Sequence, residues 1–150
     1  MFGLAYVSDA QSDFSTDEII DIAVKATSKN RQLGITGFLR YRDKRFFQYV
    51  EGDKESVLYL MDIIRDDSRH MVLNITHLPD VGFRRFDDWY MRYIPQEKFV
   101  ALDLISLLEK HLVNYSKAGM LEKDYVDKRV IRLVSRIADH HHKFPNFFQS

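Results

Sequence analysis

The stretch Ile35–Glu51, ITGFLRYRDKRFFQYVE, contains two largely apolar runs separated by four charged residues. The runs, Ile35–Tyr41 and Phe46–Glu51, are rich in aromatic and β-branched side chains, which favour strands. The connection at residues 42–45, RDKR, is short and polar, as expected of a turn between antiparallel strands. The stretch therefore predicts a β-hairpin.

Upstream of the hairpin, the sequence predicts a strand followed by a helix. Phe2–Ser8 alternates between two faces, and both are apolar enough to be largely buried. Ser15 followed by Glu18 has the form of a capping box, which begins a helix, and Gly34 is expected to end it. One face of the strand carries Phe2, Leu4, Tyr6 and Ser8 and the other carries Gly3, Ala5 and Val7.

Downstream of the hairpin, the pattern predicts a second helix and two further strands. The helix shows an apolar face from Val57 onward, Met71–Leu78 is the next strand, and Trp89–Tyr93 is the last. The resulting order is β-α-β-β-α-β-β. This order is typical of an α+β ferredoxin-like sandwich, with two helices on one face of a mostly antiparallel sheet.

The C-terminal third predicts two amphipathic helices, over residues 101–114 and 124–138. The apolar residues of the first are Leu102, Ile105, Leu108 and Leu112, and those of the second are Val126, Val130, Leu133, Val134 and Ile137. Apolar stripes of this kind need burial. We expect these helices to cap the open face of the sheet.

Composition excludes several classes of function. Lys+Arg and Asp+Glu both number 22, and this zero net charge argues against direct nucleic-acid binding and permits a homo-oligomer. The absence of cysteine excludes disulfides and thiolate chemistry. We expect no metal site either, because the consecutive residues of His140–His142 cannot all point to one site on a helix. Without an apolar run of about 20 residues or a signal peptide, we expect a cytoplasmic protein that does not bind membranes.

One polar residue, Gln48, is placed where an apolar one is expected, and two others are candidate partners for it. Gln48 alternates with Phe46 and Val50, so its amide should point into the core and needs polar partners. Tyr6, on a buried face of another strand, and Asn30, near the end of the first helix, are candidates. The alternative is that each of these side chains bonds only to the backbone, as most buried polar side chains do.

These residues belong to a longer pattern. The string Asn30–Gly52, with Tyr6 before it and Asp67-Ser68-Arg69-His70 and Trp89-Tyr90-Met91 after it, resembles a BLUF domain (blue light sensing using flavin). The resemblance covers roughly residues 1–95 and implies a flavin-binding domain there, with residues 96–150 as a helical cap or output extension. It also implies an oxidised flavin, commonly FAD with FMN or riboflavin as alternatives, held without a covalent bond between the two sheet-packed helices.

The resemblance implies a role for each matching residue. Tyr6 would donate an electron and a proton to the excited flavin, and the Gln48 amide, between that tyrosine and the flavin, would rearrange. Asn30 would hydrogen-bond the edge of the isoalloxazine ring. Arg69 and His70 would lie near the flavin and its ribityl chain.

The last predicted strand contributes two photoactive candidates, Trp89 and Met91, one of which would pack near Gln48. Because they are two residues apart, we expect them on the same side of the strand, competing for one space. Two positions depart from the family pattern: Lys29 replaces Asn or His, and Ala26 replaces Ser.

The resemblance implies a photoreceptor without catalytic turnover that signals to a partner protein. No acid/base pair or nicotinamide fingerprint is present to favour the alternative, a flavin-dependent oxidoreductase. A third possibility is a ferredoxin-like regulatory domain without a chromophore.

Overall fold

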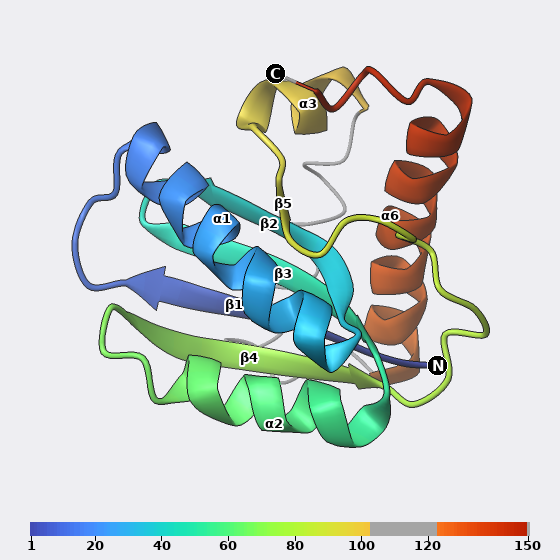
Figure 1. The fold of residues 1–150 in the computed structure, drawn as a ribbon, viewed down its shortest axis with the longest axis horizontal. Coiled ribbons are helices and arrows are strands. Elements are labelled where there is room, and N and C mark those ends of the chain that lie inside the picture. The colour runs from blue at the N-terminus through green and yellow to red at the C-terminus, as the bar shows by residue number, and fades with distance from the viewer. Residues whose placement is uncertain (103–122, 150) are drawn as a thin grey trace.

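The computed structural model describes residues 1–102 and 123–149. Its centre is a five-stranded sheet in the order β4-β1-β3-β2-β5 (Figure 1). Neighbouring strands are antiparallel except β2 and β5, which are parallel. Together with helices α1 and α2, the sheet confirms the predicted β-α-β-β-α-β-β order and the ferredoxin-like α+β class. The bounds are β1 Phe2–Ala10, α1 Thr16–Leu33, β2 Thr36–Arg42, β3 Arg45–Gly52, α2 Lys54–Arg65, β4 His70–Leu78 and β5 Arg92–Tyr93.

Both ends of α1 form as the sequence predicts. The Ser15 hydroxyl accepts a hydrogen bond from the Glu18 N–H at 3.2 Å, and the Glu18 carboxylate accepts one from the Ser15 N–H at 3.2 Å. At the other end, Gly34 adopts a left-handed conformation with φ of 67°, which only glycine takes at little cost. These local signals fix where α1 stops relative to β2, which begins two residues later.

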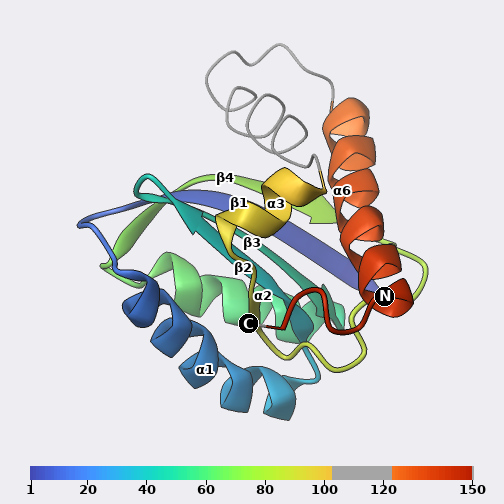
Figure 2. The same ribbon diagram turned by 90° about the horizontal axis from the view of Figure 1, so that it is seen from above.

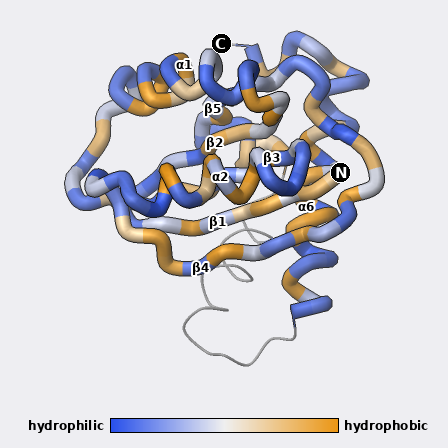
Figure 3. Tube along the Cα trace, turned by 60° about the horizontal axis from the view of Figure 1, so that its bottom comes forward, coloured by the Kyte–Doolittle hydropathy of each residue, from blue (hydrophilic) through white to orange (hydrophobic). Residues whose placement is uncertain are grey.

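The sheet is covered on both faces, and each face has its own core. Helices α1 and α2 lie on one face, and α6 (Lys123–Lys143) packs on the other (Figure 2). The alternation predicted for β1 is confirmed, since Leu4 and Tyr6 face α1 and α2 whereas Ala5 and Val7 face α6. Figure 3 shows both hydrophobic and hydrophilic stretches along α1 and α2, as amphipathic surface helices require.

Helix α6 confirms the prediction of a cap from residues 124–138. Its buried side chains recur at helical spacing and join the core formed by Phe38, Phe47 and Tyr49 of the sheet. These side chains are Val126, Val130, Leu133, Val134, Ile137 and Ala138. The other helix predicted, residues 101–114, lies outside the described residues from position 103 onward. Ala101 and Leu102 close a short helix that the pattern did not indicate, α3 (Gln96–Ala101).

The last predicted strand is wrong in its extent. Only Arg92–Tyr93 pairs with β2 as β5, whereas residues 89–91 are irregular. The Trp89 carbonyl accepts from the Gly37 N–H at 2.7 Å, and the Tyr90 carbonyl accepts from the Asn30 side chain at 2.6 Å. The backbone of this segment is therefore held by one hydrogen bond from the start of β2 and one from a side chain, and not by the regular hydrogen bonds between paired strands.

The histidine run His140–His142 lies near the C-terminal end of α6. The His140 ring contacts Phe147 with ring centroids 4.3 Å apart, and the His141 ring contacts Trp89 at 4.5 Å. Within residues 1–102 and 123–149, no group of three His, Asp or Glu side chains is arranged to hold a metal ion. In the same ranges, no helix is long and apolar enough to cross a bilayer.

Candidate functional site

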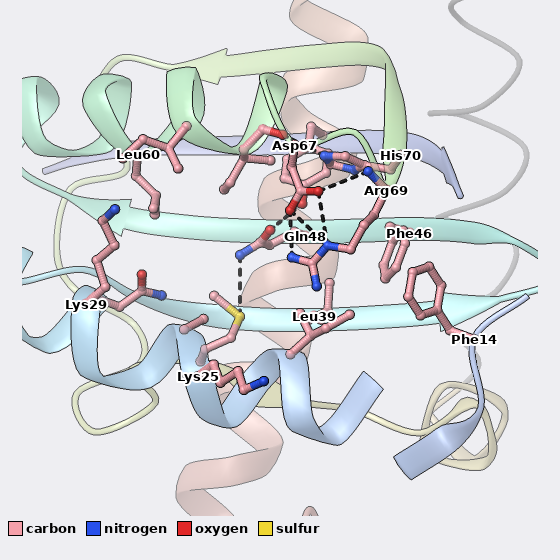
Figure 4. A pocket seen from close by; sticks show the side chains of 17 residues that line it. Phe14, Lys25, Lys29, Leu39, Phe46, Gln48, Leu60, Asp67, Arg69 and His70 are labelled. Carbon is pink, nitrogen blue, oxygen red and sulfur yellow. Dashed lines mark hydrogen bonds and ion pairs between the residues drawn. The ribbon is translucent and has the colours of Figure 1, made fainter. Parts of the chain in front are cut away.

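A cavity of about 280 Å³ opens between α1 and α2 above the sheet (Figure 4). Its size is close to the lower end of the range for small-molecule sites, roughly 300–1,000 Å³. Six residues singled out from the sequence line it: Tyr6, Asn30, Gln48, Arg69, His70 and Met91. Its other lining residues are Phe14, Ile22, Lys25, Ala26, Lys29, Leu39, Phe46, Leu60, Ile63, Ile64 and Asp67.

Tyr6 and Gln48 meet at the floor of the cavity. They are direct register partners on the antiparallel strands β1 and β3, so their side chains project on the same side. The Tyr6 hydroxyl donates a hydrogen bond to Gln48 Oε1. The polar partner expected for the buried Gln48 amide is therefore Tyr6, and the alternative of a backbone-only bond does not hold for this pair.

Burial keeps the Tyr6 hydroxyl protonated. It raises the pKa of Tyr6 above its ordinary value, and the negative charge of Asp67 raises this pKa further. Both effects disfavour the phenolate, because a buried anion near a carboxylate loses hydration and is repelled. The Tyr6 hydroxyl is thus a hydrogen-bond donor to Gln48 throughout the neutral pH range.

The other end of the Gln48 amide points toward Met91. Gln48 Nε2 lies 3.4 Å from Met91 Sδ, and thioether sulfur is a weak acceptor. This amide therefore has one strong bond, to Tyr6, and one weak bond. A side chain with one strong and one weak hydrogen bond can exchange its partners after a small change in its surroundings.

Trp89 lies on the opposite face of the sheet, which corrects the prediction that it shares a side with Met91. The Trp89 ring is almost fully buried and stacks on Phe86 with centroids 5.0 Å apart and planes at 13°. It also contacts Phe148 at 5.2 Å. The prediction failed because strand alternation does not apply to the irregular segment before β5.

Asn30 lies near the C-terminal end of α1 and is almost fully buried. Its Nδ2 donates to the Tyr90 carbonyl at 2.6 Å, so here the backbone alternative is correct for one of its bonds. An amide has four hydrogen-bonding capacities, and this bond uses one. Through this bond Asn30, which also lines the cavity, ties α1 to the segment that carries Met91.

The turn between α2 and β4 supplies a charged wall, which Figure 4 shows opposite Lys25 and Lys29 of α1. The Asp67 carboxylate accepts two bonds from Arg69 Nε, at 3.0 and 3.1 Å, and one from Arg69 Nη2 at 2.6 Å. These bonds lower the pKa of Asp67 to about 2. Asp67 thus holds the Arg69 guanidinium at the cavity.

His70 is held between two partners in the same wall. Its Nε2 lies 2.6 Å from the Ile64 carbonyl, which only accepts, so Nε2 carries a proton. Its Nδ1 lies 2.7 Å from the hydroxyl of the fully buried Ser8, which donates to it when the ring is neutral. Its ring meets that of Tyr6 edge-on, with centroids 5.9 Å apart. His70 therefore fixes one side of the space around Tyr6.

Sequence reasoning missed part of the site. Asp67 was part of the matched string, yet no role for it was derived, because its action on Tyr6 depends on the tertiary fold, although its bonds to Arg69, two residues away, are local. Lys29 and Ala26, the two departures from the family pattern, both line the cavity. Ala26 lies four residues before Asn30, and Lys29 lies three residues after Ala26, and this helical spacing was the available signal.

Comparison with known proteins places this geometry in a family. Residues 1–92 match the family model described as BLUF, sensors of blue-light using FAD. A photoactivated adenylate cyclase subunit beta of Euglena longa is 28% identical over 137 residues, which is 88% of this chain and 15% of that protein. A photoactivated adenylate cyclase subunit alpha of Euglena gracilis is 34% identical over 79 residues, which is 52% of this chain and 8% of that protein. The chain thus spans only a small part of these relatives.

Solved structures agree with the fold. BlsA in its photo-activated state matches with a TM-score of 0.64 at 26% identity, covering 89% of this chain and 94% of that one. A bacterial light-regulated adenylyl cyclase matches with a TM-score of 0.63 at 31% identity, covering 91% of this chain and 40% of that one. With more than half of its residues matched by the family model and the sheet, helices and cavity described above, the chain belongs to the BLUF family of blue-light sensors that use FAD.

Proposed function

We propose that Tyr6 and Gln48 form the light-responsive switch of this sensor, beside an oxidised FAD held without a covalent bond between α1 and α2. The observation that carries the proposal is the Tyr6 hydroxyl donating to Gln48 Oε1 at the floor of the cavity. A phenol that can lose an electron and a proton is joined there to an amide that can reverse its donor and acceptor ends.

The residues around the cavity fit a flavin ring. The ring is a flat and largely apolar body with polar atoms along one edge. Ala26, Leu39 and Leu60 supply apolar walls, and the amides of Asn30 and Gln48 supply hydrogen-bond donors and acceptors. Asn30, Gln48, Arg69 and His70 are the residues we propose for holding the polar edge and the ribityl chain.

The switch follows from the bonds that Gln48 makes. A bound flavin would supply the absorption of blue light and an acceptor for one electron. Tyr6 is the nearest phenol to Gln48, and its hydroxyl proton lies on the hydrogen bond to Oε1. If the amide reverses or changes tautomer, the group facing Tyr6 becomes a donor and the Tyr6 oxygen accepts. The bond toward Met91 changes at the same time, with no movement of the strand required.

The output is proposed to be an altered contact with a separate signalling protein, without catalytic turnover in this chain. Three of the proteins named above are light-regulated cyclases, so a second-messenger enzyme is one class of partner. Helix α6 and its core contacts around Trp89 lie on the face away from the cavity, where a partner can be reached. A homo-oligomeric state, which the neutral charge permits, and a cytoplasmic location belong to the same proposal.

Absorption spectra of the purified protein test this proposal against its alternatives. A yellow protein whose flavin band shifts to the red under blue light, and returns in darkness, is the expected result. Bleaching of the yellow colour by NADH would favour a flavin-dependent oxidoreductase. A protein that stays colourless after incubation with FAD, FMN and riboflavin would favour a regulatory domain without a chromophore.

A further inference from the structure

Glu51, near the end of β3, is a carboxylate with no exposure to solvent. Its Oε1 accepts hydrogen bonds from the N–H groups of Arg85 at 2.7 Å and Phe86 at 2.8 Å. The same oxygen accepts from the Thr36 hydroxyl at 3.2 Å, and Oε2 accepts from the Tyr49 hydroxyl at 2.9 Å. Burying a carboxylate is costly unless its lone pairs are used. Four donors make this a well-satisfied junction between β3 and the chain at residues 85–86.

The groups around Glu51 are suited to donate. Burial, followed by the Glu51 carboxylate, raises the pKa of Tyr49, so its hydroxyl keeps its proton. The Arg84 guanidinium donates to Thr36 Oγ1 at 2.8 Å, which leaves the Thr36 hydroxyl proton for Glu51. The side chain of Arg85 bonds to a different element: its Nε donates to Ser135 Oγ of α6 at 3.2 Å. The junction therefore connects β2, β3 and α6.

Beyond this junction, the chain is fixed again only a few residues later. The Trp89 carbonyl accepts from the Gly37 N–H at 2.7 Å, and Met91 Sδ contacts Gln48 Nε2 at 3.4 Å. Immediately afterwards, β5 pairs with β2. Residues 86–91, which we call the strap, are thus held at one end by Glu51 and at the other by β5.

The strap connects the two faces of the sheet. Gln48 faces the cavity with its strand neighbours Phe46 and Val50, whereas Glu51 bonds to Tyr49 on the α6 side. Within the strap, Phe86 and Trp89 stack in the core beneath α6 and Met91 lies at the cavity. Coupling between sites is carried by packed side chains and hydrogen-bonded segments. A fixed start of the strap would let a movement of Met91 act on Trp89, whereas a loose start would absorb part of it.

We propose that Glu51 is a positioning residue that anchors the start of the strap, so that a change at Gln48 is passed to Trp89 and α6. The inference rests on the proposed function, since it concerns how the Gln48 switch reaches the far face. It adds a fixed point that lies outside the flavin cavity. Glu51 acts through the backbone of Arg85 and Phe86 and touches none of the reacting groups.

Hydrogen exchange of the flavin-loaded protein, in darkness and under blue light, tests the anchor with two variants. Glu51→Met keeps an unbranched side chain but removes the acceptor for the Arg85 and Phe86 N–H groups. Glu51→Gln keeps one acceptor oxygen for these groups and should behave like the unmodified protein. For Glu51→Met, we expect the red shift to persist while the light-induced exchange difference over Val126–Ala138 falls to half or less. A variant that is only destabilised would exchange faster in both states and keep the difference.

Tyr49→Phe is the matched control, because it removes a donor to Oε2 and leaves both backbone bonds to Oε1. It should retain the response of α6. The unmodified protein gives a second measurement that does not depend on a variant folding. Its Arg85 and Phe86 amides should exchange slowly, and equally in darkness and light. Fast exchange of these amides, or a full α6 response in Glu51→Met, would overturn the anchor. A wild-type protein without a red shift would instead contradict the proposed switch.

Discussion

Tyr6 and Gln48 face each other across β1 and β3, and the Tyr6 hydroxyl donates to Gln48 Oε1 in a nearly solvent-free site. Strand pairing fixes their backbones, so only the side chains are free to exchange donor and acceptor roles. The geometry explains how a small change in bonding can occur without a change of fold. It also makes each residue around the pair separately testable.

Tyr6→Phe should leave flavin bound and abolish the red-shifted state, because the ring remains while the transferable hydroxyl proton is lost. Absorption spectra before and after blue light check this. The matched control is Tyr49→Phe, which removes a buried hydroxyl from the opposite face of the sheet and should shift normally. A normal yield of the shifted state in Tyr6→Phe would exclude Tyr6 as the donor.

Gln48→Leu should also remove the red shift while keeping the flavin. Leucine fills much of the same space beside Phe46 but has no amide to reverse, and it leaves the Tyr6 hydroxyl without its acceptor. Loss of that bond should cost about 1–3 kcal/mol of stability, measured by chemical denaturation. An unaltered light-minus-dark spectrum in this variant would exclude the amide switch.

Asn30→Ala should weaken flavin retention more than it weakens the fold. The loss of a hydrogen bond worth on the order of 1 kcal/mol corresponds to a several-fold rise in the dissociation constant. Titration with FAD, together with circular dichroism, separates the two effects. Thr27→Ala is a suitable control, since Thr27 lies on α1 and bonds the Ala23 carbonyl but does not line the cavity. Equal FAD affinity in both variants would remove Asn30 from the binding site.

The Asp67–Arg69 pair should make stability depend on pH only in strong acid. The pKa of folded Asp67, about 2, lies below its ordinary value of 3.8. Its stabilisation is therefore complete above the unfolded value and is lost as the pH falls toward the folded one. Because the pair is partly exposed, we expect about 1 kcal/mol or less. Denaturation curves at several acidic pH values should show this loss in the wild type and its absence in Asp67→Asn.

Trp89→Ala should destabilise the protein by about 3–5 kcal/mol, because it empties a fully packed site between Phe86 and Phe148. The folded fraction should still show the red shift, since Trp89 lies on the far face from the cavity. Denaturation and difference spectra of the same sample measure both quantities. Loss of the shift in folded Trp89→Ala would show that Trp89 acts on the flavin side.

The features predicted correctly are those that local sequence determines. The Ser15–Glu18 capping box, the Gly34 helix end and the pairing of the hairpin all depend on residues near one another in the chain. The place of Gln48 followed from strand alternation, and its pairing with Tyr6 followed from two buried polar residues needing partners.

The segment before β5 was not predictable in this way. Its course is set by tertiary bonds from Gly37, Asn30 and Glu51, which no local pattern contains. Strand alternation was therefore applied to residues that form no strand, and it placed Trp89 on the wrong face. The effect of Asp67 on Tyr6 was not predicted for the same reason, since only the fold brings these two residues together.

The central claim, that the Gln48 amide changes its bonding under blue light, is tested most directly by infrared difference spectroscopy. Light-minus-dark spectra of flavin-loaded protein would be recorded with unlabelled and with ¹³C,¹⁵N-labelled glutamine. We predict amide side-chain bands that shift with the label in the wild type and are missing in Gln48→Leu. Difference bands that are insensitive to glutamine labelling in a protein with a normal red shift would contradict the account.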